Sequence, residues 1–159
     1  MSLNIFYLCN FEDLMQEDHS YWIIAFFENS NWEREYLLIN QKSDNWSFWW
    51  FPKWHAEEWE DWLQAAKREF WEEVGIKHVR TIWAQTFDTE YIFHRLWMSN
   101  IHKTVTFWVG KVENKDVEIQ IEELNWYKRA NFESAMNLLS HKNYKDLLEK
   151  VAKYIDMEK

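Results

Sequence analysis

Three glutamates close together in the chain are the residues best suited to chemistry. Glu72 and Glu73 follow Glu69 by three and four positions. At 3.6 residues per helical turn, this spacing places all three carboxylates on one side of a helix. Oxygen ligands gathered in this way suit Mg²⁺ or Mn²⁺, which bind carboxylates together with water and substrate phosphates. The spacing therefore favours a divalent metal site, but three glutamates alone also fit a solvated acidic helix face.

A helix over residues 60–74 is needed to carry these glutamates. Apolar side chains recur at the spacing of one helical face, namely Trp62, Leu63, Ala66, Phe70 and Val74. Gly75 follows, as is typical just beyond the end of a helix. Lys67 and Arg68 can neutralise only part of the local negative charge. The segment is therefore predicted to be an amphipathic helix with an acidic outer face.

The rest of the chain is predicted to contain both strands and helices. Short apolar runs predict strands over residues 21–28, 35–41, 78–87, 90–97 and 103–113. Residues 131–139 and 143–155 are predicted to be helices, and Asn131 can cap the first of them. Residues 42–56 are predicted to be a loop, and residues 1–18 an irregular or partly ordered lead-in. The order of strands, helix, strands and helix predicts a single domain of the mixed α/β (α+β) class.

The composition narrows the function classes. The net charge of −9, from 18 basic and 27 acidic residues, argues against a broad grip on the DNA or RNA backbone. No run of 18 apolar residues predicts a membrane span. The single cysteine excludes an internal disulfide and a multi-cysteine zinc site. With no secretory signal expected, a cytoplasmic protein acting on a small molecule is predicted, and its oligomeric state stays open.

Glycine is scarce in this chain and tryptophan is abundant. There are 2 glycines and 13 tryptophans, whereas average usage would give about 11 glycines. Several tryptophans stand in polar, turn-like segments, where glycine is common, such as Trp32, Trp46 and Trp59. Our hypothesis is that several of them stand for glycines, through UGA codons read as tryptophan or through engineering. The alternative is a naturally tryptophan-rich core, and UGG codons throughout would contradict the UGA explanation.

The segment from Trp54 to Ile76 resembles the Nudix box. That family pattern is a glycine, five residues, a glutamate, seven residues, and then Arg-Glu-apolar-any-Glu-Glu-any-Gly-apolar. The matching positions are Glu60, Arg68, Glu69, Phe70, Glu72, Glu73, Gly75 and Ile76. Only the opening glycine differs, because Trp54 occupies it. The preceding Phe-Pro-Lys-Trp-His, residues 51–55, resembles a motif of the diadenosine tetraphosphate hydrolases.

This resemblance implies a fold and a reaction. The fold is a Nudix-like α/β/α sandwich over residues 1–159, with residues 1–18 outside the resemblance. A mixed central sheet would carry the Nudix-box helix and a C-terminal helix. The implied reaction is Mg²⁺-dependent (or Mn²⁺-dependent) hydrolysis of a nucleoside polyphosphate by water attack on phosphorus. Diadenosine tetraphosphate, cleaved to ATP and AMP, is the substrate that the resemblance favours.

The resemblance also implies roles for individual residues. The metal ligands would be Glu69, Glu72 and Glu73, and Arg68 would orient one of these glutamates. A further carboxylate, Glu123 or failing that Glu122, would serve as metal ligand or base. The implied phosphate contacts are Lys53, His55 and Lys103. His141 matches a base-stacking position, and Tyr91 or Phe93 would form the other side of the base site.

Two other functions stay open from the sequence. Family glycine positions are occupied by Trp50, Trp54 and Trp59. Glycine there permits positive φ and close approach to phosphate, so tryptophan would strain or fill the site. A catalytically impaired Nudix-fold module that binds nucleotides is therefore one alternative. The other is a nucleoside triphosphate or RNA 5′-end pyrophosphohydrolase, which uses the same box.

Overall fold

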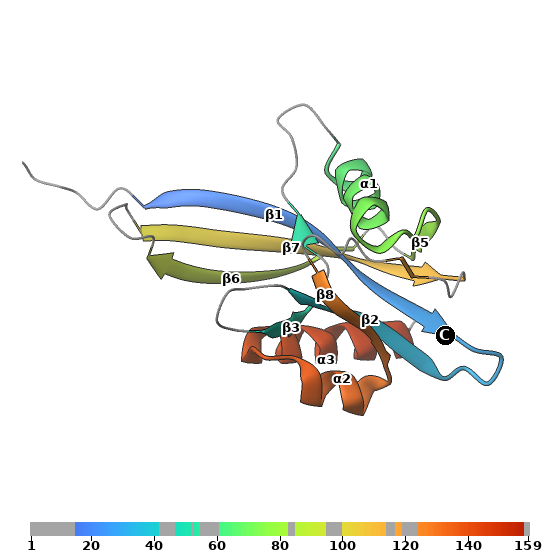
Figure 1. Ribbon diagram of the computed structural model, residues 1–159. Coiled ribbons are helices and arrows are strands. Elements are labelled where there is room, and N and C mark those ends of the chain that lie inside the picture. The colour runs from blue at the N-terminus through green and yellow to red at the C-terminus, as the bar shows by residue number, and fades with distance from the viewer. Residues whose placement is uncertain are drawn as a thin grey trace, which may run out of the picture.

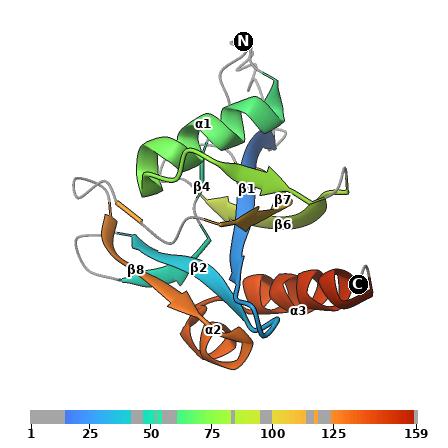
Figure 2. The same cartoon turned by 90° about the vertical axis from the view of Figure 1, so that its right-hand side faces the viewer.

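The computed structural model describes residues 15–41, 47–51, 53–54, 61–82, 85–94, 100–113, 117–118 and 124–157. They form a mixed sheet with helices on both faces (Figures 1 and 2). The strands are β1 (Gln16–Glu28), β2 (Arg34–Gln41), β3 (Phe48–Trp50), β4 (Lys53–Trp54), β5 (Val79–Thr81), β6 (Phe87–His94), β7 (Asn100–Val112) and β8 (Leu124–Ala130). The helices are α1 (Trp62–Val74), α2 (Phe132–Leu138) and α3 (Lys142–Met157). Within these described segments, no helix combines the length and apolar character that crossing a membrane requires.

Strand β1 is the centre of the sheet. It pairs in parallel with β7, in a register that runs from Gln16 opposite Ile101 to Phe26 opposite Lys111. It also pairs antiparallel with β2 and β4, while β7 pairs antiparallel with β5 and β6. Strand β2 continues the sheet to β3 and β8. The sheet is therefore mixed, as predicted.

The apolar run of β1 is continuous because both of its faces are covered. Successive side chains of a strand point to opposite faces. Trp22, Ile24 and Phe26 belong to one core with residues of α2 and α3. Ile23, Ala25 and Phe27 belong to the other core, with residues of α1. The predicted sandwich, with the Nudix-box helix on one face and the C-terminal helix on the other, is confirmed.

Helix α1 begins and ends with local signals that the sequence contains. The Asp61 carboxylate accepts a hydrogen bond from the backbone N–H of Gln64 at 3.1 Å, which caps the first turn. Gly75 closes the helix with a φ of 72°, and its N–H donates to the Trp71 carbonyl at 2.8 Å. Glycine adopts this left-handed conformation without strain. The helix predicted over residues 60–74 is thus confirmed, starting two residues later.

The turn between β1 and β2 places a tryptophan in a left-handed conformation. Among the residues that the structure describes, Trp32 is the one non-glycine residue with a positive φ, 62°. Trp32 is 66% exposed, so it is not part of the core. The Asn29 carboxamide oxygen closes the turn by accepting from the N–H groups of Asn31 and Glu33. This conformation supports the hypothesis that Trp32 stands for glycine.

The structure corrects several predicted boundaries. β1 starts at Gln16, within the lead-in that was predicted to be irregular. The predicted loop 42–56 contains the short strands β3 and β4, and only Val79–Thr81 of the segment 78–87 forms β5 before β6 begins at Phe87. Strand β8 was not predicted as a strand. Pairing with longer neighbours fixes these segments, and their own residue pattern is too short or too polar to reveal it.

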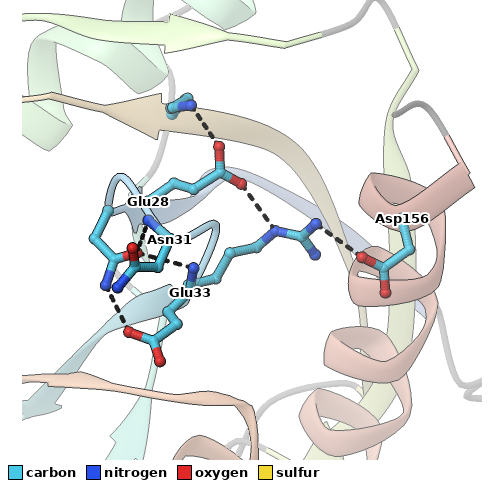
Figure 3. A network of polar contacts seen from close by, with 7 residues as sticks. Glu28, Asn31, Glu33 and Asp156 are labelled. Atoms are coloured by element: carbon cyan, nitrogen blue, oxygen red, sulfur yellow. Dashed lines mark hydrogen bonds and ion pairs between the residues drawn. The ribbon is translucent and has the colours of Figure 1, made fainter.

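A polar network that is buried at Glu28 and reaches the surface at Asp156 ties the β1–β2 hairpin to the last helix. Glu28 lies between two cations, with Lys111 Nζ at 2.7 Å and Arg34 Nε at 3.3 Å (Figure 3). Arg34 reaches on to Asp156 of α3 with Nη2 at 2.8 Å. Figure 3 shows Glu28 and Asp156 at opposite ends of this connection. The hairpin, β7 and α3 are therefore held together by charge pairs as well as by apolar packing.

Candidate functional site

Two of the three glutamates of α1 converge on one cation. The Arg68 Nη1 atom lies 2.6 Å from Glu69 Oε1 and 3.0 Å from Glu72 Oε2. All three side chains are partly exposed. Glu73 lies on the side of α1 that faces the sheet and is only 7% exposed. The structure thus brings Glu69 and Glu72 together at the surface, with Glu73 beneath them.

Glu69 and Glu72 supply two carboxylates of the kind that a hard divalent cation binds. Both carboxylates contact the Arg68 guanidinium. A metal ion could bind one or both of them, while Arg68 keeps a hydrogen bond to one carboxylate and so fixes its orientation. Across the described segments, no three His, Cys, Asp or Glu side chains form a group that could hold a metal. Glu122 and Glu123 lie outside the described residues. The assignment of the metal ligands and of Glu123 therefore stays a prediction.

A cavity lined with aromatic side chains lies on the α3 side of the sheet. Its volume is about 300 Å³, and we name it the aromatic pocket; its lining residues are Trp50, Glu90, Tyr91, His141, Asn143 and Tyr144. The His141 ring stacks on Phe48, with centroids 5.2 Å apart and planes at 29°. Tyr91 and His141 were predicted to bind a base together, and both line this pocket. The Phe93 ring packs against Tyr91, with ring centroids 6.0 Å apart, and Phe93 does not line the pocket.

Two tyrosines at the pocket wall, Tyr91 and Tyr144, influence each other's hydroxyl groups. Burial raises the pKa of Tyr144, and the hydrogen bond to Tyr91 raises it further. Burial also raises the pKa of Tyr91, with a contribution from the charge of Asp18. Both hydroxyls therefore stay neutral near pH 7. Sequence analysis did not identify Tyr144 or Phe48 as site residues. Tyr144 could have been noticed, because it is an aromatic residue with a hydroxyl group on the apolar face of the predicted helix 143–155.

Lys103, predicted to contact phosphate, is a buried cation. It is 2% exposed, and its Nζ lies 2.7 Å from Asp18 Oδ2. On the opposite side, β6 places Tyr91 directly beside it. Lys53 lies in β4 opposite Trp22, and only its backbone is described. His55 lies outside the described residues, so three predicted phosphate contacts stay predictions.

A larger open cleft, of about 1090 Å³, lies between the β1–β2 hairpin, α2 and α3. None of the residues predicted for the site lines it. Several of its charged groups pair with one another, since Glu28, Arg34 and Asp156 form the network of Figure 3 and Arg129 pairs with Glu35. The aromatic pocket is therefore the better candidate for binding a nucleotide base.

Comparison with known proteins identifies the family. The sequence profile of the NUDIX domain matches residues 19–150. The chain belongs to the Nudix family. This confirms the family suggested by the box on α1 and places Gly75 and the glutamates within a Nudix domain.

Within the Nudix family, the chain resembles one group of enzymes. It is 32% identical over 118 residues to the asymmetrical bis(5′-nucleosyl)-tetraphosphatase of Rattus norvegicus, covering 72% of this chain and 76% of that one. It is 33% identical over 116 residues to the enzyme of the same name from Sus scrofa, with the same coverage. The predicted Nudix hydrolase of tetraphosphatase type is confirmed at this level.

The fold agrees with a solved structure of the same group. A binary complex of the Caenorhabditis elegans Ap4A hydrolase superposes with a TM-score of 0.68. That alignment covers 87% of this chain and 97% of the other, at 22% identity. At this identity the likeness shows the fold alone. It is the mixed sheet with helices on both faces that the sequence predicted.

Proposed function

We propose that this Nudix hydrolase cleaves a phosphoanhydride bond of a nucleoside polyphosphate, with diadenosine tetraphosphate giving ATP and AMP as the favoured reaction. The observation that carries the proposal is the convergence of Glu69 and Glu72 on the exposed side of a Nudix-box helix. The similarity to asymmetrical bis(5′-nucleosyl)-tetraphosphatases supports the choice of substrate.

The acidic residues of α1 would hold a divalent ion, with Mg²⁺ or Mn²⁺ favoured by the all-oxygen donors. Glu69, Glu72 and Glu73 are the proposed ligands, and Glu123 is a further ligand or the base. When bound, the ion would neutralise phosphate charge and lower the pKa of a water molecule. Arg68 acts as a positioning residue, because its guanidinium fixes the carboxylates of Glu69 and Glu72.

Hydrolysis forms one phosphorus–oxygen bond from water and breaks the anhydride bond to the leaving nucleotide. Such reactions depend mainly on positioning and on neutralising charge. The proposed phosphate contacts are Lys53, His55 and Lys103. These side chains would supply local positive charge for the polyphosphate, which the chain as a whole, with a net charge of −9, would repel.

The aromatic pocket is the proposed base site. Every nucleobase offers a flat π-face to aromatic side chains. His141 stacks on Phe48 at one wall, and Tyr91 and Tyr144 form another. The neutral hydroxyls of the two tyrosines add hydrogen-bonding groups to a mainly apolar cavity. This combination suits a purine ring.

The test measures ATP released from diadenosine tetraphosphate with and without Mg²⁺. We expect metal-dependent release by the wild type and its loss in Glu72→Gln. The matched control is Glu133→Gln, an exposed glutamate in the first turn of α2, which should keep wild-type activity. Equal activity of Glu72→Gln and wild type would contradict the proposal.

Two other outcomes would redirect the assignment. Nucleotide binding without turnover in the wild type would indicate a binding module, the alternative raised by tryptophan at positions 50, 54 and 59. Turnover of nucleoside triphosphates or of RNA 5′ ends, in preference to diadenosine tetraphosphate, would indicate a pyrophosphohydrolase with the same box.

A further inference from the structure

Asp18 and Lys103 form an ion pair beside the aromatic pocket. The parallel register of β1 and β7 places the two residues opposite each other, and Asp18 Oδ2 lies 2.7 Å from Lys103 Nζ. The antiparallel register of β7 and β6 places Tyr91 on the other side of Lys103. Tyr91 lines the pocket. The carboxylate of Asp18, the ammonium group of Lys103 and the pocket residue Tyr91 therefore lie in a row across β1, β7 and β6.

The surroundings make this pair stronger than a typical surface pair. Lys103 is almost fully buried, whereas the Asp18 side chain is partly exposed. Charges interact more strongly where water is excluded. The charge of Asp18 also extends to Tyr91, whose pKa is raised by burial first and by Asp18 second. A phosphate group that reached Lys103 would thus find its ammonium group already paired with a carboxylate.

Asp18 also lies just outside the segment that matches the Nudix domain, which begins at residue 19. The pair thus joins a residue of the lead-in to the lysine that the proposed function assigns to phosphate. A lysine ammonium carries one charge, so a phosphate that takes this charge must compete with the carboxylate.

We propose that Asp18 is a specificity-determining residue that competes with the ligand phosphates for Lys103. The inference rests on the proposed function, in which a nucleotide places its base in the aromatic pocket and a phosphate at Lys103. A ligand must then bring enough negative charge to displace the carboxylate. Ligands without phosphate gain nothing from Lys103 and are indifferent to Asp18.

The experiment measures binding without turnover. Isothermal titration calorimetry in EDTA gives the Kd of ATP and of adenosine for the wild type, Asp18→Asn and Glu17→Gln. Glu17 is the matched control, since it is the neighbouring residue on the opposite face of β1 and its carboxylate pairs with His102 at 3.0 Å. We expect Asp18→Asn to bind ATP about five- to tenfold more tightly. The Kd of adenosine should change less than about twofold in both variants, as should that of ATP in Glu17→Gln.

A second pair of variants shows whether the gain acts through the lysine. Asp18→Asn combined with Lys103→Met should bind ATP no more tightly than Lys103→Met alone. Circular dichroism melting checks the fold, and Asp18→Ser replaces Asp18→Asn if the latter is unfolded at the assay temperature. Unchanged or weaker ATP binding by a folded Asp18 variant would overturn the proposal, since Asp18 would then support Lys103 without competing.

The proposed hydrolysis can fail separately from this inference. A wild type that binds ATP but releases no products with Mg²⁺ would refute the hydrolysis, while the effect of Asp18→Asn on binding would still support competition. A wild type that binds neither ATP nor adenosine would overturn both.

Discussion

The acidic side of α1 and the aromatic pocket are built by different means. On α1, Glu69 is adjacent to Arg68 and Glu72 follows Arg68 by one helical turn, so both contacts are local in sequence. The pocket draws His141 and Tyr144 from the C-terminal segment and Tyr91 from β6. Its walls meet only when the sheet and α3 have formed. A group of site residues on one helix can be recognised from their spacing in the sequence, whereas a site built from separate strands and helices is recognised only once the fold is known.

Replacing Arg68 by alanine tests the local region and has the largest expected effect. Without the guanidinium, the Glu69 and Glu72 carboxylates lose the group that orients them. We expect hydrolysis to fall by about 10- to 100-fold, as is usual for partners of metal ligands. The measurement is kcat/KM as a function of Mg²⁺ concentration, with the neighbouring Lys67→Ala as the control. Equal loss in both variants would indicate a general effect of helix charge.

Replacing His141 by alanine tests the long-range region. Stacking of a base on an aromatic side chain contributes about 1–3 kcal/mol, so nucleotide binding should weaken about tenfold or more. Calorimetry with adenosine isolates the base from the phosphates. The control is His78→Ala, because His78 is an exposed histidine that does not line the pocket. Unchanged adenosine binding in His141→Ala would show that the base does not bind in this pocket.

Replacing Trp32 by glycine tests a third local feature, the turn after β1. A left-handed conformation costs a non-glycine residue about 1–2 kcal/mol, and the greater freedom of glycine in the unfolded chain offsets part of this. We expect a gain of about 1 kcal/mol, seen as a rise in Tm of about 2–4 °C. Trp126→Gly is the matched control, because Trp126 is 71% exposed but lies in strand β8.

The two tryptophan variants should differ in sign. Glycine weakens a strand interior, so Trp126→Gly should lower the Tm while Trp32→Gly raises it. A lower Tm in Trp32→Gly would show that the indole stabilises the turn. It would also weaken the hypothesis that this tryptophan stands for glycine.

Replacing Asp61 by alanine has the smallest expected effect and sharpens the description of α1. Loss of the cap to the Gln64 N–H should cost about 1 kcal/mol of stability. Denaturant unfolding measures this change, and Asp61→Asn should recover most of it because asparagine also caps helices. A large loss of hydrolysis with unchanged stability would instead assign Asp61 a role in the active site.

The same division explains what the sequence could predict. The helix predicted over residues 60–74 and its end at Gly75 follow from spacing within one segment, and the structure has the helix at Trp62–Val74. The same spacing brings Glu69 and Glu72 together, whereas the burial of Glu73 depends on packing against the sheet. The extension of β1 back to Gln16 could not be predicted, because its polar residues form a strand by pairing with β7. For the same reason Lys103 was recognised as a candidate, but its burial against Asp18 was not. Tyr144 was hidden among the apolar positions of its helix.

The alignment of β1 with β7 has a consequence for how faithfully the chain assembles. Glu17 meets His102 and Asp18 meets Lys103 at successive steps of one ladder. A slip of one residue would exchange the two faces of the strand and separate both pairs at once. Both ion pairs therefore stabilise the observed alignment of β1 with β7 over its shifted alternatives, independently of any ligand.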